Sequence, residues 1–152
     1  MEVKDIIKEA VTVDEDASFK DAVALMIDKQ TNSLLVTNET GELTGEVTVS
    51  DLLEAIVPDF LSGDSVAAHF ATNEMFDEAV HDTAEKQIKF FMSTDFSPVR
   101  ENESAMAIAA NAIAHNRVRI PVVNDENIPV GIISRRGLKH IIAGSLNITD
   151  KK

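Results

Sequence analysis

The chain has 152 residues, enough for one domain or for two small ones that share a core. Apolar residues make up 44% of it, and no segment approaches the ~18 consecutive apolar residues of a membrane span. The formal net charge is -12, which disfavours nucleic-acid binding through a broad basic face because phosphate backbones are also negative. Cysteine is absent, so disulfides and thiolate metal sites are excluded.

The first ten residues, MEVKDIIKEA, alternate acidic and basic side chains and lack the basic-then-apolar order of a secretion signal. Together with the absence of cysteine, this favours a cytoplasmic protein without a membrane span. Trp and Tyr are also absent, which removes the usual aromatic anchors of protein interfaces and of base stacking.

An internal repeat organises the chain. Residues Val13–Val57 align with Val99–Ala143 without a gap, at a shift of 86 residues, and ten of the 45 aligned pairs are identical. Other pairs exchange similar residues, as Thr48 and Ser134 do. One copy is too small to bury its own sheet and helices, so we expect the two copies to pack together.

Both copies predict the order β-α-β-β-α from their hydrophobic periodicity and turn residues. In the first copy, Ser18 is a plausible cap of the first helix. The elements of the first copy are expected over 10–13, 19–29, 33–37, 43–49 and 51–57. Those of the second copy are expected over 96–99, 105–115, 118–123, 129–134 and 137–143, with Ser104 as the matching cap.

The stretch between the copies begins at Pro58, which with LSGDS stops the preceding helix. Residues 66–91 then predict helix, and we interpret it as a connector that packs over the core, in preference to a lid or a partner-binding helix. Its apolar positions are Val66, Phe70, Met75, Phe76, Ala79 and Val80. The predicted organisation is a first repeat over 1–58, a helical linker over 59–87, a second repeat over 88–146 and a flexible tail over 147–152.

The stretch GEVTVSD, residues 45–51, ends a predicted strand and begins a predicted helix. There, the hydroxyl of Thr48 and the N–H groups of the helix start can hold a phosphate. The carboxylate of Asp51 can accept hydrogen bonds from two ribose hydroxyls. A simpler interpretation is that Ser50 or Asp51 only caps the helix. Local sequence alone favours the simpler interpretation, because capping residues occur at most helix starts.

The duplicated order, the strand motifs NSLLV and RIPVV, and the pattern G-h-h-[ST]-x-x-D in GEVTVSD together resemble the CBS domain family, named after cystathionine β-synthase. The resemblance covers nearly the whole chain and implies a tandem pair, or Bateman module. The implied fold is α/β (α+β), with two β-α-β-β-α repeats packed about a pseudo-twofold axis and a helical linker.

The resemblance also implies a function. Such pairs bind AMP, ADP, ATP or S-adenosylmethionine in clefts between the repeats, commonly dimerise through their helices, and act as regulatory modules that are not enzymes. We therefore expect a homodimer that senses an adenosine nucleotide, needs no cofactor, and signals to a downstream protein that the sequence does not identify. The alternative is a non-catalytic dimerisation or docking scaffold with degenerate clefts.

The resemblance assigns residues to the first cleft. The ribose and phosphate would be held by Thr48, Ser50 and Asp51. The adenine wall would be formed by Ser97, Val118 and Arg119. A small residue is usual at the place of Arg119, whose long side chain could block adenine or reach a phosphate.

In the second cleft, the adenine wall would be formed by Val11, Asn32 and Ser33. The matching strand-to-helix stretch is GIISRRG, which keeps Ser134 but has Gly137 where the first copy has Asp51. The missing carboxylate removes charge-assisted hydrogen bonds of about 1.5–3 kcal/mol each. Bidentate phosphate contacts from Arg135 and Arg136 could offset that loss.

Catalytic and metal sites find no support in the sequence. The four histidines do not form a zinc pattern, and the nucleophile motif G-x-S-x-G does not occur. Glu46 would face the same side of its strand as Thr48, but a carboxylate there would repel phosphate, so we assign it no role. We expect no catalytic residues and no metal.

Overall fold

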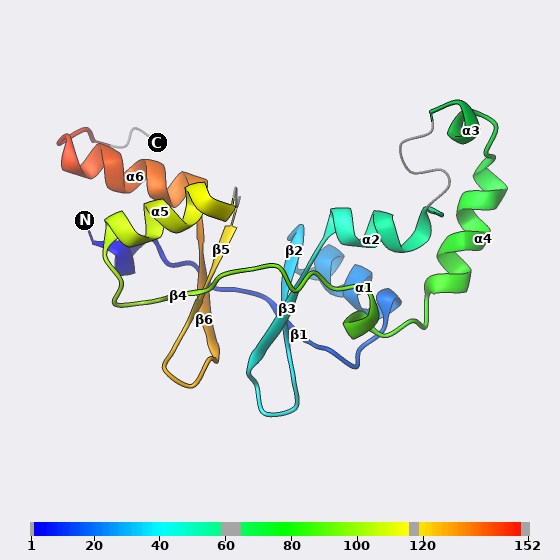
Figure 1. The fold of residues 1–152 in the computed structure, drawn as a ribbon, viewed down its shortest axis with the longest axis horizontal. Helices are drawn as coiled ribbons and strands as arrows, with labels where there is room; N and C mark the ends of the chain where they lie inside the picture. Colours follow the sequence, from blue (N-terminus) through cyan, green and yellow to red (C-terminus); the bar gives the residue numbers. More distant parts are fainter. Residues whose placement is uncertain (1, 59–64, 116–118, 150–152) are drawn as a thin grey trace. The chain divides into compact units, whose positions relative to one another are not determined.

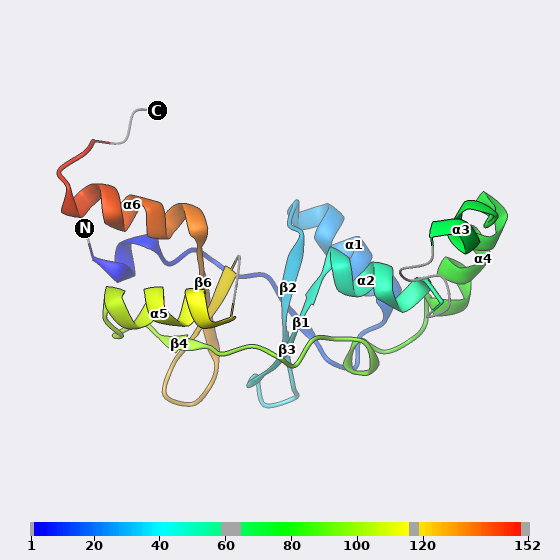
Figure 2. The ribbon, with the colours of Figure 1, turned by 45° about the horizontal axis from the view of Figure 1, so that its top comes forward.

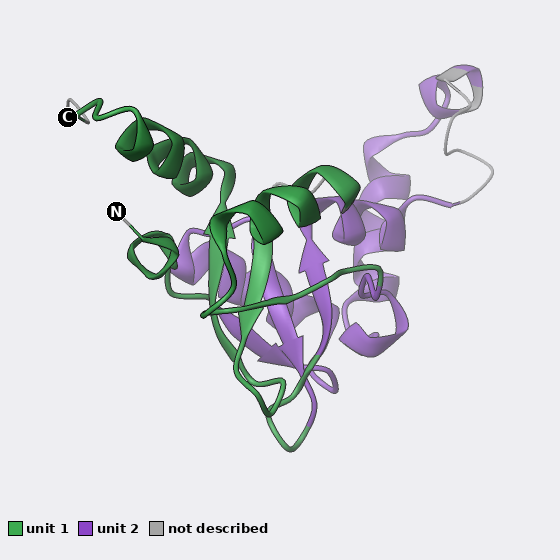
Figure 3. Cartoon of the chain, turned by 60° about the vertical axis from the view of Figure 1, so that its left-hand side comes forward, with its two compact units in different colours: residues 1–10, 39–43, 95–152 green, residues 11–38, 44–94 purple. Residues whose placement is uncertain are grey.

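The computed structural model describes residues 2–58, 65–115 and 119–149. The chain divides into two compact units, drawn in green and purple in Figure 3. Unit 1 comprises residues 1–10, 39–43 and 95–152, and unit 2 comprises residues 11–38 and 44–94. Unit 2 therefore contains the first aligned repeat apart from residues 39–43, together with residues 58–94, and unit 1 contains the second aligned repeat together with residues 1–10 and 39–43.

The elements follow the predicted order in both repeats (Figure 1). The chain begins with η1 (Val3–Ile6), β1 (Thr12–Asp14), α1 (Phe19–Lys29), β2 (Ser33–Thr37), β3 (Leu43–Thr48) and α2 (Val49–Ile56). It continues with α3 (Ser65–His69), α4 (Asn73–Thr83) and η2 (Ile88–Phe90). The second repeat contains β4 (Val99–Arg100), α5 (Ala105–His115), β5 (Arg119–Val123), β6 (Pro129–Ser134) and α6 (Arg135–Ser145).

Two three-stranded sheets form, with the orders β1-β2-β3 and β4-β5-β6. The first strand pairs with the second in parallel in both sheets, with Val13 opposite Val36 and Val99 opposite Val122. A parallel pair needs a crossover connection, and α1 and α5 supply it. The fold class is thus mixed α/β, as predicted.

The helix starts follow from local hydrogen bonds. Ser18 caps α1, and its hydroxyl accepts a hydrogen bond from the Asp21 N–H at 3.1 Å, which confirms the predicted cap. The bounds of α1 and α5 match the predicted ranges, whereas α2 and α6 each begin two residues before the predicted position. The earlier starts place Thr48 and Ser134 at the N-caps.

Each unit has its own hydrophobic core. In unit 2, α1 and α2 cover the strands, and the core consists of Phe19, Ala22, Met26, Leu34, Val36, Val47, Leu52, Ile56 and Ile88. In unit 1, the core consists of Ile6, Val99, Ile108, Ile120, Val122 and Ile133. Both cores therefore include a residue from outside the aligned repeat: Ile88, predicted to begin the second repeat, lies in the core of unit 2, and Ile6, predicted within the first repeat, lies in the core of unit 1.

The segments outside the repeats add hydrogen bonds to strand edges. Lys8 exchanges two backbone hydrogen bonds of 2.8 Å with Ile132 in β6. Ser93 exchanges two of 2.9 Å with Glu46 in β3. The added segments lie very close to glycines that the repeat alignment pairs, Gly131 and Gly45. A Cβ at Gly131 would come within 2.5 Å of the Lys8 carbonyl oxygen.

The linker packs less than the sequence led us to expect. Its C-terminal part belongs to the core, because Ile88 is fully buried and Ala79 and Val80 pack beside it. In α4, however, none of the described residues is buried. Val66, Phe70, Met75 and Phe76 remain 48–77% exposed, so the expected packing of these four side chains is wrong.

Candidate functional site

A capping box forms the start of α2. Thr48 is the N-cap, and its Oγ1 accepts a hydrogen bond from the Asp51 N–H at 3.3 Å. In return, Oδ2 of Asp51 accepts hydrogen bonds from the Thr48 N–H at 2.8 Å and the Thr48 hydroxyl at 3.1 Å. The alternative that Ser50 or Asp51 is the N-cap is therefore wrong, and Ser50 lies exposed in the first turn.

The capping box fixes the orientation of the Asp51 carboxylate. Its two hydrogen bonds from Thr48 both use Oδ2, and Oδ1 has no hydrogen-bond partner among the described residues. The side chain is half-buried. Because one oxygen is held and the other can accept, the carboxylate is oriented before any ligand arrives.

The start of β2 lies next to this corner. The Val49 N–H, the first of α2, donates to the Asn32 carbonyl at 3.2 Å, and Leu35 N–H donates to the Val11 carbonyl at 2.9 Å. Ser33 follows Asn32 as the first residue of β2. Unit 2 thus contains the ribose and phosphate residues predicted for one cleft and the adenine-wall residues predicted for the other.

Unit 1 repeats this arrangement with different side chains. Ser134 caps α6, and its hydroxyl accepts a hydrogen bond from the Gly137 N–H at 3.1 Å. Arg119 lies opposite Ser134 in the β5–β6 pair. The structure therefore brings a guanidinium-bearing residue to the same end of the sheet as the capping hydroxyl.

The remaining predicted residues of unit 1 differ in their surroundings. Arg135 and Arg136 are exposed at the start of α6. Ser97 is half-buried, and the Asn111 side-chain amide donates to its carbonyl at 3.2 Å and its hydroxyl at 3.3 Å. Val118 lies outside the described residues.

Packing leaves little room for a side chain at Gly137, the position in the second corner that matches Asp51. Gly137 is buried, and a Cβ there would lie 3.1 Å from the Cβ of Ile6 and 3.4 Å from its Cδ1. An aspartate at this position would therefore push against η1, which lies beside α6 in Figures 1 and 2. The sequence reveals the missing carboxylate but not this contact.

Asp51 lines a pocket within unit 2 of about 470 Å³. Its lining also includes Glu54 from α2, and Lys86, Phe90 and Phe91 from the linker. Lys86 brings a cation into the surroundings of Asp51. The sequence reading missed this residue, since Lys86 lies far from GEVTVSD in the chain and belongs to no recognisable motif.

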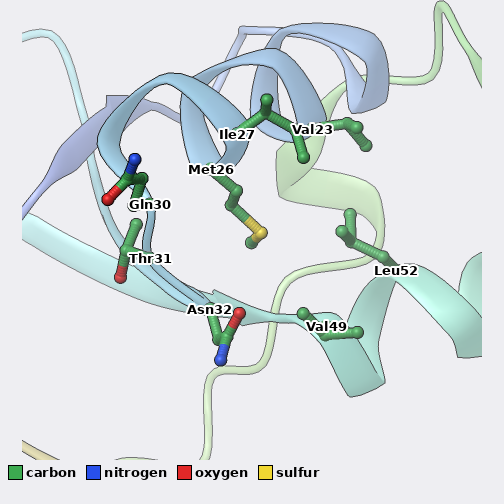
Figure 4. A pocket seen from close by; sticks show the side chains of 8 residues that line it. All are labelled: Val23, Met26, Ile27, Gln30, Thr31, Asn32, Val49 and Leu52. Atoms are coloured by element: carbon green, nitrogen blue, oxygen red, sulfur yellow. The ribbon is translucent and has the colours of Figure 1, made fainter.

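A second pocket in unit 2, of about 430 Å³, lies between α1 and α2 (Figure 4). Figure 4 shows the Met26 side chain extending into it from α1. The lining is mostly apolar, and Asn32 is the predicted site residue that contributes to it. Its lining residues are Val23, Met26, Ile27, Gln30, Thr31, Asn32, Val49 and Leu52.

The described ranges contain neither a cluster of metal-binding side chains nor a membrane-spanning helix. Within residues 2–58, 65–115 and 119–149, no group of three or more His, Asp or Glu side chains could hold a metal ion. The helices in these ranges are too short or too polar to cross a lipid bilayer.

The family described as CBS domain matches residues 3–58 and 86–144, which together are more than half of the chain. The two matched segments correspond to the two sequence repeats.

Two curated relatives resemble the chain. A homoserine O-acetyltransferase of Methanobrevibacter ruminantium is 28% identical over 142 residues, which is 93% of this chain but 24% of the relative. The chain therefore spans about a quarter of the length of that relative. An uncharacterised protein of Methanocaldococcus jannaschii is 26% identical over 149 residues, with 91% of this chain and 89% of the relative covered.

Solved structures share the fold. The CBS domain of a membrane protein from Sphaerobacter thermophilus has a TM-score of 0.73 and 25% identity, covering 92% of this chain and 86% of that one. CBSX2 in complex with AMP has a TM-score of 0.69 and 21% identity, covering 95% and 98%. The CBS domain pair of protein MJ0100, in complex with 5-methylthioadenosine and S-adenosyl-L-methionine, has a TM-score of 0.67 and 23% identity, covering 95% and 98%.

Proposed function

Because the chain belongs to the CBS domain family and carries two copies of the domain, we propose that it is a regulatory module that binds an adenosine-containing ligand. The candidate ligands are AMP, ADP, ATP and S-adenosylmethionine. Two structures of the same fold, CBSX2 and the MJ0100 domain pair, were solved with ligands of this chemistry. Their identity to this chain is 21% and 23%, so the proposal depends on the residues of this chain.

The observation that carries the proposal is the state of the Asp51 carboxylate. Oδ2 is held by Thr48, and Oδ1 has no hydrogen-bond partner among the described residues. Vicinal ribose hydroxyls are donors that an oriented carboxylate can bind. Asp51 is therefore proposed as the ribose contact, with adenine against Ser97, Val118 and Arg119.

Two features support a phosphate contact next to Asp51. The N-terminal end of α2 carries partial positive charge, and Ser50 adds an exposed hydroxyl, whereas the Thr48 hydroxyl already donates to Asp51. Lys86 lines the same pocket as Asp51 and adds a full positive charge. We therefore add Lys86 to the proposed phosphate-binding residues.

The second cleft is proposed to bind more weakly. Gly137 offers no carboxylate, and Ile6 leaves little room for one. Ser134, Arg135 and Arg136 could still hold a phosphate, with Val11, Asn32 and Ser33 as the adenine wall. The second candidate function is a docking scaffold with degenerate clefts. The missing carboxylate at Gly137 supports it, and it would be preferred if the first cleft also binds no ligand.

We propose that the module works as a homodimer. Several apolar side chains on the helices of both repeats are exposed, which is costly unless another surface covers them. Residues of this kind are Ile27 on α1, Ile113 on α5 and Ile142 on α6, at 75%, 82% and 63% exposure. Light scattering after gel filtration tests this proposal, and a monomeric mass would contradict it.

We propose that ligand binding regulates a partner by changing the geometry of the module. A ligand shifts the balance between two geometries only by the difference in its affinity for them.

The acetyltransferase activity of the Methanobrevibacter relative is not carried over to this chain, because the match spans 24% of that protein. We propose a binding function without catalysis.

Isothermal titration with AMP, ADP, ATP and S-adenosylmethionine tests the proposal. We expect binding of at least one, and a loss of affinity of at least about tenfold in Asp51→Ala, equivalent to one charge-assisted hydrogen bond. Asp28→Ala is the control, since Asp28 is an exposed acid on α1 of the same unit. No heat with any ligand, for protein shown to be folded by circular dichroism, would contradict the proposal.

A further inference from the structure

The carbonyl of Ser97 lacks a backbone hydrogen bond that its counterpart in the first repeat has. In unit 2, the Leu35 N–H donates to the Val11 carbonyl at 2.9 Å. The repeat alignment pairs Val11 with Ser97 and Leu35 with Pro121, and the two parallel strand pairs have matching registers. Because proline has no N–H, the corresponding donor is missing in unit 1.

The side chain of Asn111 takes the place of that donor. Asn111 lies in α5, and its Nδ2 donates to the Ser97 carbonyl oxygen at 3.2 Å and to the Ser97 Oγ at 3.3 Å. The amide has two N–H bonds, so it can give one to each oxygen. The matching residues of the first repeat, Leu25 and Val11, are apolar and pack against the core of unit 2. A hydrogen-bonded pair in unit 1 thus corresponds to an apolar pair in unit 2.

The other end of the Asn111 amide is unpaired. Its Oδ1 is buried and has no hydrogen-bond partner among the described residues. A buried acceptor without a partner lowers stability, and a leucine, as in the first repeat, would avoid that cost. A half-turn of the amide would set Oδ1 against the Ser97 carbonyl oxygen, so it would not help. Both hydrogen bonds that this amide gains go to Ser97, which is a predicted site residue.

The hydrogen bond to Oγ determines how the Ser97 hydroxyl can act. A hydroxyl oxygen can accept one hydrogen bond while its own proton is donated to a third group. Because Oγ accepts from Asn111, its O–H bond is directed away from the amide. Within the described ranges, no residue accepts that proton. The hydroxyl is therefore held as a donor.

We propose that Asn111 is a positioning residue for base recognition. It holds the Ser97 hydroxyl so that this hydroxyl donates a hydrogen bond to a ring nitrogen of adenine, and Asn111 itself does not contact the ligand. This inference rests on the proposed function, in which Ser97 forms part of the adenine wall. The unsubstituted ring nitrogens of adenine, N1, N3 and N7, are all acceptors and suit a fixed donor. A donor oriented in advance also lowers the entropic cost of binding.

Isothermal titration with AMP and its 1-deaza, 3-deaza and 7-deaza analogues tests the proposal, because each analogue has C–H in place of one ring nitrogen. We expect the wild-type protein to bind at least one analogue about tenfold more weakly than AMP. In Ser97→Ala and in Asn111→Leu, the same analogue should bind within about threefold of AMP. Met106→Leu, at an 80% exposed position of α5, is the control and should keep the tenfold difference.

A double variant separates the positioning of the hydroxyl from support of the backbone. Asn111→Leu/Pro121→Leu recreates the leucines of the first repeat and returns an N–H for the Ser97 carbonyl, but it gives the hydroxyl no partner. We expect this variant to bind AMP and the analogue equally well. A regained difference would overturn the proposal, since a partner for the carbonyl alone would then suffice.

The outcomes distinguish this inference from the proposed function. Equal binding of AMP and all three analogues by the wild type, or a difference that persists in Asn111→Leu, would overturn the role of Asn111 and leave nucleotide binding intact. No binding of AMP would also overturn it, and the titrations with ADP, ATP and S-adenosylmethionine would then decide the proposed function. Circular dichroism checks the fold of each variant, and Asn111→Ala is the second replacement if Asn111→Leu does not fold.

Discussion

The Asp51 carboxylate accepts two hydrogen bonds from Thr48, one from the backbone N–H at 2.8 Å and one from the hydroxyl at 3.1 Å. The residue proposed to bind ribose is therefore also part of the structure that starts α2. A substitution of Asp51 can act on stability as well as on ligand binding. Experiments on this corner need variants that separate the two effects.

Removal of the cap hydroxyl should lower stability. Thr48→Ala removes the acceptor for the Asp51 N–H and one donor to its carboxylate, so we expect a loss of about 1 kcal/mol in the free energy of unfolding. Urea denaturation measures it. Ser50→Ala is the control and should change stability by less than about 0.5 kcal/mol, because Ser50 is exposed. Equal losses in both variants would contradict the capping role.

The paired glycines should respond differently to a methyl group. In Gly131→Ala the new Cβ would meet the backbone carbonyl of Lys8 at 2.5 Å, and we expect a loss of about 1–3 kcal/mol. In Gly45→Ala the nearest atom is the Met92 sulfur, at the flexible part of a side chain. We expect a smaller loss there. Thermal unfolding of the two variants compares them, and the reverse order would be inconsistent with the strand-edge packing.

Ile88 should be important for the stability of unit 2, although the sequence places it at the start of the second repeat. It is fully buried with Phe19 and Leu34 in the core of unit 2, so Ile88→Ala should cost about 2–5 kcal/mol. Phe90, two residues later, is 67% exposed, and Phe90→Ala should cost less than about 1 kcal/mol. Chemical denaturation of both variants checks this, and similar losses would mean that the segment is not anchored at Ile88.

The ion pair of Lys89 with Asp16 should make the free energy of unfolding depend on pH at high pH. Its hydrogen bond to the Asp16 carboxylate, 2.8 Å long, raises the pKa of Lys89 above its ordinary value of 10.5, and nearby acids add to this. The folded state therefore binds the proton more tightly than the unfolded state. This stabilisation is present below the ordinary pKa and is lost as pH rises through the raised pKa.

The measurement compares wild type with Lys89→Met. We expect the wild type to be more stable in urea near about pH 8 and the difference to shrink at about pH 11.5. Lys20→Met is the control, since Lys20 is exposed on α1. A difference between wild type and Lys89→Met that persists unchanged at high pH would exclude the ion pair as its cause.

The sequence predicted what depends on local patterns. Helical spacing and a capping serine placed α1 from Phe19 to Lys29, and strand patterns placed β2 and β6 at their observed bounds. The corner between β3 and α2 was found from GEVTVSD, although the cap proved to be Thr48. Each of these features is fixed by residues close together in the chain.

Contacts between segments far apart in the chain could not be predicted from local sequence patterns. Nothing near Ile88 or Ile6 in the sequence indicates that these residues complete the cores of unit 2 and unit 1. The contact of Ile6 with Gly137, and the approach of Lys86 to the pocket of Asp51, join segments far apart in the chain. Periodicity also could not decide that Phe76 stays exposed, because an amphipathic stripe does not say what covers it.

The pairing of Lys8 with Ile132 sets an order in which the protein can form during synthesis. Residues 11–94 contain all of unit 2, so this unit can fold soon after residue 94 leaves the ribosome. The first ten residues must wait for β6, which begins only at Pro129. For most of that time the apolar side chains of η1 lack their native cover, which makes them the natural place for a chaperone to act on the nascent chain.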